Sequence, residues 1–99
     1  MSSVYGEAFE IIINPKKVPT IYYDIFMMRG KTNLELHNDQ EAITDFNWAV
    51  FLKPDLGEAY RLRAEGKLRV NKPAEACEDL VKSRERGTNV DDTMQRHCR

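Results

Sequence analysis

Two histidines and two cysteines are the side chains of this chain best suited to chemistry, because imidazole and thiolate groups act as bases, nucleophiles and metal ligands. His37 falls in a polar stretch, and Cys77 has no other cysteine or histidine near it in the sequence. His97 and Cys98 are adjacent, but a metal site needs a closed set of ligands. We therefore expect no metal site, with a metal bound by His97 and Cys98 as the weaker alternative.

Motifs for catalysis or cofactor binding are not found in the sequence. The five glycines are scattered and form no phosphate-binding loop, and no serine or cysteine has a base close to it in sequence. Two cysteines without CxxC spacing do not make a disulfide framework, so we expect Cys77 to be a buried, reduced thiol. The chain is predicted to be no enzyme and to bind no cofactor.

Charge and hydrophobicity limit the classes of partner. The chain has 99 residues, and its 15 Lys and Arg residues are interspersed with 16 Asp and Glu residues. A nucleic-acid-binding protein usually carries a basic excess, so we expect no nucleic-acid partner. No apolar run is long enough to cross a bilayer, and the N-terminal basic residues follow the apolar stretch, unlike those of a signal peptide. We therefore expect no membrane partner and a soluble, cytoplasmic protein.

An internal repeat organises the chain. Glu41 and Ala42 recur 34 positions later as Glu75 and Ala76, and Asp45 recurs as Asp79. The same offset aligns further residues of like size, namely Phe26 with Tyr60, Arg29 with Arg63, Gly30 with Ala64, Leu34 with Leu68 and Phe46 with Leu80. A fixed period of this length is typical of a helical array.

Each repeat is predicted to be a helix, a short turn and a second helix, because its apolar residues recur at spacings of three and four. We place the first repeat at 22–54, closed by Pro54, and the second at 56–88, where Gly87 suits a left-handed helix end. The same offset projects a helix of a preceding unit onto 1–14 and a capping helix onto 89–99. In this capping helix Val90, Met94 and Cys98 align with Leu56, Tyr60 and Ala64, and we expect them to cover the second hairpin. The fold class is therefore predicted to be all-α, as one domain of two full repeats with a half-repeat at each end.

The positions at which the two repeats carry residues of similar size resemble those of the tetratricopeptide repeat family. The matching residues, expected to pack between the helices, are Phe26, Gly30, Ala42, Phe46, Ala49 and Pro54 in the first repeat and Tyr60, Ala64, Ala76, Leu80 and Ser83 in the second. The sequence departs from the family pattern at Arg29 and Arg63, where a leucine-like residue is usual, and at Asn33 and Lys67, where an aromatic residue is usual. These departures are expected to weaken the core of each hairpin.

The resemblance implies a right-handed superhelix whose first helices line a concave groove and bind a peptide or a partner protein, without catalysis. Beside the packing stripe, the groove residues would be Asp24, Met27, Met28, Lys31, Glu58, Arg61, Leu62, Glu65 and Arg69. Met27 and Met28 either form an adaptable binding surface or pack on the N-terminal helix. Family members that grip a C-terminal carboxylate use Lys and Asn, and Asp24, Met28, Glu58 and Leu62 at those positions do not favour that ligand.

Two functions follow from these patterns. The first is an interaction module, such as an adaptor, scaffold or assembly factor, that binds a protein or peptide through the groove. The alternative is a structural subunit of a homo- or hetero-oligomeric assembly, in which self-association supplies the stability that two repeats lack. Trp48 lies outside the packing stripe and is a candidate outer-face patch for a partner.

Overall fold

The computed structural model describes residues 19–98, and within them it contains helices and no strand. The helices are α2 (Thr20–Glu35), α3 (Asp39–Leu52), α4 (Gly57–Arg69), α5 (Pro73–Glu85) and α6 (Asp91–His97). For this part of the chain the expectation of an all-α fold is confirmed. The helix predicted at 1–14 lies outside the described residues.

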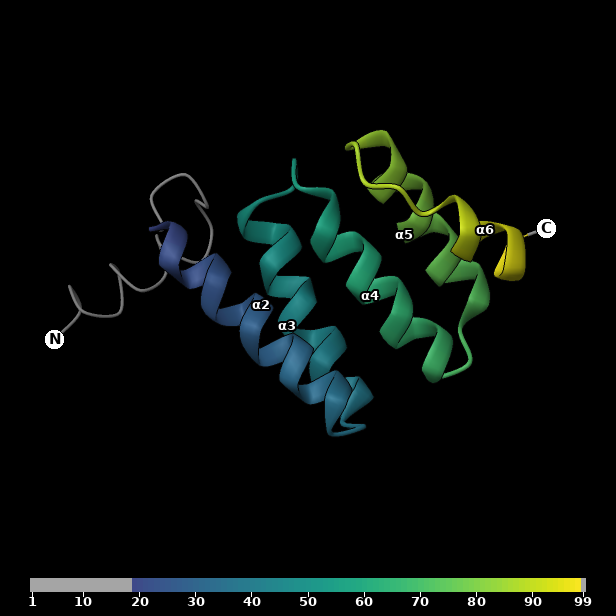
Figure 1. The fold of residues 1–99 in the computed structure, drawn as a ribbon. Coiled ribbons are helices and arrows are strands. Elements are labelled where there is room, and N and C mark those ends of the chain that lie inside the picture. The colour runs from purple at the N-terminus through teal and green to yellow at the C-terminus, as the bar shows by residue number, and fades with distance from the viewer. Residues whose placement is uncertain (1–18, 99) are drawn as a thin grey trace, which may run out of the picture.

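Figure 1 shows two hairpins side by side, α2 with α3 and α4 with α5, followed by α6. The hairpins meet through α3 and α4, and α6 lies along α5 at the end of the chain. None of these helices is both long enough and apolar enough to span a membrane.

The turns that follow α2, α4 and α5 share one geometry. His37, Asn71 and Gly87 have φ values of 62°, 61° and 89°, and so lie in the left-handed region. The residue after each donates its amide to a carbonyl in the last turn of the helix, with N–O distances of 2.8 Å from Asn38 to Asn33, 2.8 Å from Lys72 to Lys67 and 3.1 Å from Thr88 to Ser83. This is the Schellman end of a helix. His37 is therefore a turn residue, and the left-handed end predicted at Gly87 is confirmed.

Small residues face large ones inside each hairpin. A Cβ atom added to Gly30 would lie 2.5 Å from the ring of Phe46, which is completely buried. In the second hairpin Ala64 packs in one cluster with Leu80. The two pairs fill a similar volume between their helices. In the first hairpin the small Gly30 faces the large Phe46. In the second, Ala64 is larger than Gly30, and Leu80 is correspondingly smaller than Phe46.

The C-terminal segment covers the second hairpin through three side chains. Val90 is buried in the cluster of Ala64, Ala76 and Leu80, and Met94 and Cys98 pack against that cluster. Cys98 also forms a disulfide with Cys77 of α5. The prediction of a reduced Cys77 is therefore wrong, because α6 folds back along α5 and brings together two cysteines that are 21 residues apart in sequence. A metal held by His97 and Cys98 is also ruled out, since the Cys98 sulfur is bonded to Cys77.

Substituting Gly30 by Ala tests the match of sizes inside the first hairpin. Because the added methyl group would overlap the buried Phe46 ring, we expect Gly30→Ala to lower the free energy of unfolding by about 1–3 kcal/mol. Phe46→Leu, combined with Gly30→Ala, reproduces the pair found in the second hairpin and should recover part of that loss. Urea unfolding of both single variants and the double variant gives the coupling energy. Strictly additive effects would contradict the predicted match.

Candidate functional site

The most enclosed charged groups of the described chain are two aspartates at equivalent positions. Asp45 of α3 is 2% exposed and Asp79 of α5 is 1% exposed. Arg63 donates two hydrogen bonds to Asp79, from Nε at 2.8 Å and from Nη2 at 2.6 Å. Lys67 places its Nζ 2.8 Å from the same carboxylate. Both cations come from α4, so the ion cluster ties the two helices of the second hairpin together.

The first hairpin repeats this cluster with weaker partners. Arg29 donates to Asp45 from Nε at 3.0 Å and from Nη2 at 2.6 Å, and Asn33 donates from Nδ2 at 2.9 Å. The hydrogen bond to Asp45 raises the pKa of Arg29. The four residues that depart from the tetratricopeptide pattern are thus the partners of the two aspartates. A polar cluster therefore occupies the space between the helices, and the weakening expected from these four residues stays a prediction.

Aromatic rings complete the same clusters. The guanidinium of Arg29 lies 5.5 Å from the centre of the Phe26 ring, and that of Arg63 lies 5.6 Å from the centre of the Tyr60 ring. Cation–π contacts of this kind add an electrostatic attraction between the arginine and the ring. Within the described residues no buried side-chain nitrogen or oxygen lacks a hydrogen-bond partner. The aspartates are therefore engaged in holding the hairpins together, which is a structural role.

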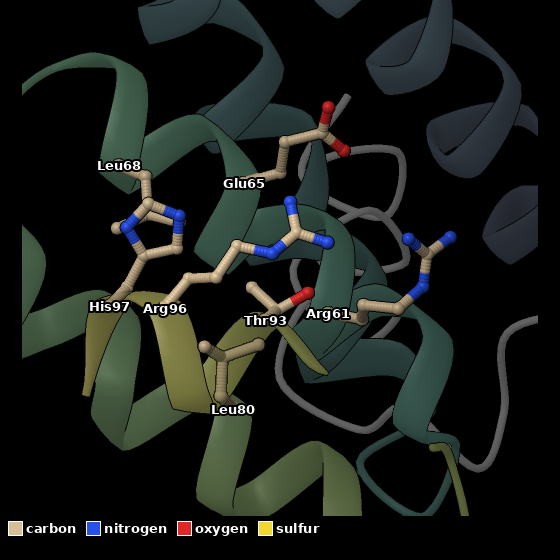
Figure 2. Close-up of a pocket in the computed structure, with 7 residues that line it drawn as sticks. All are labelled: Arg61, Glu65, Leu68, Leu80, Thr93, Arg96 and His97. Atoms are coloured by element: carbon tan, nitrogen blue, oxygen red, sulfur yellow. The ribbon is translucent and has the colours of Figure 1, made fainter. Parts of the chain in front are cut away.

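A pocket of about 310 Å³ lies between α4 and α6. Its lining residues are Arg61, Glu65, Leu68, Leu80, Thr93, Arg96 and His97. Figure 2 shows the side chains of α4 and those of α6 gathered around it, with Leu80 of α5 among them. We call this site the α4–α6 pocket. It combines two leucine side chains with charges of both signs.

The charges around the α4–α6 pocket are held in pairs. Arg61 donates to Glu58 from Nη2 at 2.6 Å and from Nε at 3.1 Å. This hydrogen bond lowers the pKa of the Glu58 carboxyl and raises the pKa of Arg61, so both groups stay charged at neutral pH. Glu65 accepts from Arg69 at 3.1 Å, and Arg96 pairs with Asp92. Paired side chains of this type are restrained before a ligand arrives.

Arg69 connects the pocket-bearing helix to the first hairpin. Its Nη1 donates to the backbone carbonyl of Leu34 at 2.7 Å and lies 3.3 Å from Asp39. Because Arg69 also binds Glu65 of the pocket, it orients that carboxylate relative to both hairpins. The predicted groove residue Arg69 thus acts beside the pocket and not in its lining.

The structure brings only part of the predicted groove together. Arg61 and Glu65 line the α4–α6 pocket, and Glu58 and Arg69 bind them. On α2, Asp24, Met28 and Lys31 are exposed. Met27 and Leu62 are both only 5% exposed and belong to the core cluster of the first hairpin. Their assignment to an open groove is wrong, because α4 packs against the first hairpin and encloses these faces of the two helices.

The predicted packing residues lie almost entirely in the core. Buried are Gly30, Ala42, Phe46, Ala49, Tyr60, Ala64, Ala76 and Leu80. Phe26 is half-buried, and Pro54 is exposed. The carbonyl of Pro54 accepts hydrogen bonds from Tyr60 Oη at 3.1 Å and from Arg86 Nε at 2.6 Å. Pro54 therefore supports the junction between the hairpins through its backbone.

Trp48, the predicted outer-face residue, is half-buried in an aromatic cluster. Its ring stacks on Phe26 with the centroids 6.0 Å apart and meets Phe51 edge-on at 6.0 Å. Much of the surface of the Trp48 indole is thus covered by Phe26 and Phe51 of the same chain.

Sequence reasoning missed the three pocket residues that α6 contributes. The projection onto the capping segment assigned Val90, Met94 and Cys98 to packing, and these residues do pack on the second hairpin. Thr93, Arg96 and His97 are at helical spacing from one another and form the neighbouring stripe. That spacing was the available signal that α6 has a second face beside α4.

Comparisons with protein-family models, with curated proteins and with solved structures found no match to this chain.

The two buried aspartates should differ in their contribution to stability. Asp79→Ala leaves Arg63 without a counter-charge and Lys67 with only Glu75, at 3.9 Å, and both side chains are only 14% exposed, so we expect a loss of about 3–5 kcal/mol in the free energy of unfolding. For Asp45→Ala we expect about 1–3 kcal/mol, because Arg29 is 60% exposed and water can solvate it. Asp24→Ala, at an exposed aspartate, is the control for urea unfolding. A larger loss for Asp45→Ala would refute this ordering.

Proposed function

We propose that this chain is a non-catalytic protein–protein interaction module that binds a peptide or a segment of a partner protein in the α4–α6 pocket. The observation that carries the proposal is the pocket itself, which joins the exposed face of α4 to α6. A volume of about 310 Å³ lies at the lower end of the range for ligand sites. It suits one or two side chains of an extended peptide.

The composition of the pocket indicates how such a segment binds. Leu68 offers apolar surface above the buried Leu80, and burial of an apolar anchor there supplies most of the affinity. Arg61, Glu65 and Arg96 surround that surface with both signs of charge. Charges at the rim chiefly set orientation and the rate of association. The favoured ligand is therefore a peptide with an aliphatic anchor flanked by charged residues.

The tetratricopeptide-like architecture is part of this proposal. Its support is the repetition of whole structural details at one offset, namely the left-handed turns at His37 and Asn71 and the aspartate clusters at Asp45 and Asp79. Two hairpins that repeat in this way stack as units of an array. In such arrays the exposed faces of the first helices are a common place for partners.

The disulfide bears on where the protein works. The sequence predicts a cytoplasmic location because it has neither a signal-peptide pattern nor a long apolar run. Disulfides persist in oxidising compartments and are rare in the cytosol, where thiols are kept reduced. The bond between Cys77 and Cys98 therefore favours an oxidising compartment over the cytoplasm.

Charge reversal in the pocket tests the proposed function. Peptides are selected from a displayed random library on the oxidised protein, and their affinities are measured by fluorescence polarisation. Glu65→Lys places a third cation beside Arg61 and Arg96, so we expect it to weaken the selected peptides by about tenfold, which is ~1.4 kcal/mol. Glu78→Lys makes the same change at an exposed position of α5 outside the pocket lining and is the matched control. Failure to select any peptide, or equal weakening by both variants, contradicts the proposal.

A second candidate function, a subunit of a larger assembly, is favoured by the surface of α2. Ile21, Ile25 and Met28 are 61%, 47% and 69% exposed and lie at helical spacing on this helix. At the repeat offset, Ile25 and Met28 correspond to Ala59 and Leu62 of α4, which are buried against the first hairpin. The α2 surface is thus equivalent to one that α4 uses for stacking, and a helix of another subunit would fit it.

Met28→Glu tests this assembly function. If subunits associate through α2, the charge should lower the association constant by about tenfold or more, because an ionised carboxylate must then be buried at the contact. Light scattering over a range of protein concentrations measures the mass. Leu36→Glu, at another exposed apolar residue near the end of α2, is the control. A wild-type protein that remains monomeric at every concentration excludes self-assembly through this surface.

A further inference from the structure

The attachment of α6 to the rest of the chain is slight. The helix has seven residues, and none of them is buried. A helix of this length is not stable by itself in water. Beyond the disulfide, apolar contact with the second hairpin comes from Val90, which precedes the helix, and from Met94 within it. The position of α6 thus depends strongly on how its far end is held.

The disulfide holds that far end, which also carries the pocket residues. Cys98 follows His97 directly, and Arg96 and His97 both line the α4–α6 pocket. Val90 anchors the start of the segment, whereas the bond from Cys98 to Cys77 of α5 anchors its end. The side of the pocket formed by α6 is therefore fixed by one covalent bond.

We propose that the Cys77–Cys98 disulfide is a redox-sensitive latch that holds α6 in place and keeps the α4–α6 pocket formed. In the oxidised protein the pocket has both sides. In the reduced protein α6 separates from α5, and Thr93, Arg96 and His97 leave the pocket. The consequence for binding rests on the proposed function, whereas the movement of α6 does not.

Opening the latch needs a dithiol reductant. One thiolate of the dithiol attacks a sulfur of the disulfide and forms a mixed disulfide, and the other cysteine leaves as a thiolate that takes up a proton. The second thiol of the reductant then displaces the attached cysteine. Overall, two electrons and two protons pass from the dithiol to Cys77 and Cys98, and the dithiol becomes a disulfide. Both cysteines are partly exposed, so a reductant can reach them.

Hydrogen exchange of the full-length protein tests the movement of α6. Amide exchange is measured by NMR for residues 91–97 before and after addition of dithiothreitol. We expect exchange in this segment to be at least about tenfold faster in the reduced protein, because opening of a helix without its anchor costs less free energy. Amides of α3, which do not contact α6, should keep their rates. Equal rates for residues 91–97 in both states overturn the proposal.

Cys98→Ser supplies the matched variant. It should show the fast exchange of the reduced protein, and dithiothreitol should change it no further. The same variant controls for effects of the reductant on other parts of the chain. If Cys98→Ser keeps the slow exchange of the oxidised wild type, the disulfide does not hold α6 and the latch is refuted.

Peptide binding separates the latch from the proposed function. A peptide selected on the oxidised protein should bind the reduced protein and Cys98→Ser about tenfold more weakly, since one side of the pocket is lost. If exchange increases but the peptide binds both states equally, the latch does not control the pocket and that part of the proposal is wrong. If no peptide is selected at all, the proposed function fails, and the exchange experiment still decides whether the disulfide holds α6.

Discussion

The carboxylate buried between the two helices of each hairpin is the interaction on which the rest of the structure depends. Removing Asp45 or Asp79 from water carries a high free-energy cost unless each oxygen gains a strong partner. Arg63 donates to both oxygens of Asp79, whereas Arg29 donates twice to one oxygen of Asp45 and Asn33 donates to the other. Lys67 supplies a further contact to Asp79. Because these partners lie on the first helix and the aspartate on the second, the charge pairing fixes the register between them.

Apolar packing then follows that register. With the helices of the first hairpin aligned by Asp45, Gly30 lies directly over Phe46 and leaves no space for a methyl group. Gly66 has a comparable position between hairpins, where an added Cβ would lie 2.8 Å from Ile43. α4 can therefore approach α3 closely, and Leu62 joins the core of the first hairpin. The exposed face of α4 that remains is the one that carries Arg61 and Glu65.

The sequence predicted the two repeated hairpins, but it did not predict the disulfide or the α6 side of the pocket. Its period located the hairpins and their small-to-large contacts, because these depend on residue sizes at fixed spacing, as for Gly30 and Phe46. The period also aligned Asp45 with Asp79 and Arg29 with Arg63. It did not predict that each arginine binds an aspartate, because that requires knowing how the two helices of a hairpin are rotated about their axes. The same missing rotation explains why Met27 and Leu62 were assigned to a groove. The disulfide and the α6 side of the pocket each occur once, so the repeat contained no second copy to reveal them.

The bond between Cys77 and Cys98 also joins two helices that are packed to different extents. A hairpin normally completes itself with a second helix, and here that role is taken by α5 with its 13 residues. Within residues 19–98 α6 has no second helix of its own, and its end is joined to α5 by the disulfide. A covalent link between two side chains thus substitutes for the burial of a whole helix. If the proposed latch operates, the part of the chain that the structure describes has two hairpins and α6 when the disulfide is formed, and two hairpins alone when it is reduced.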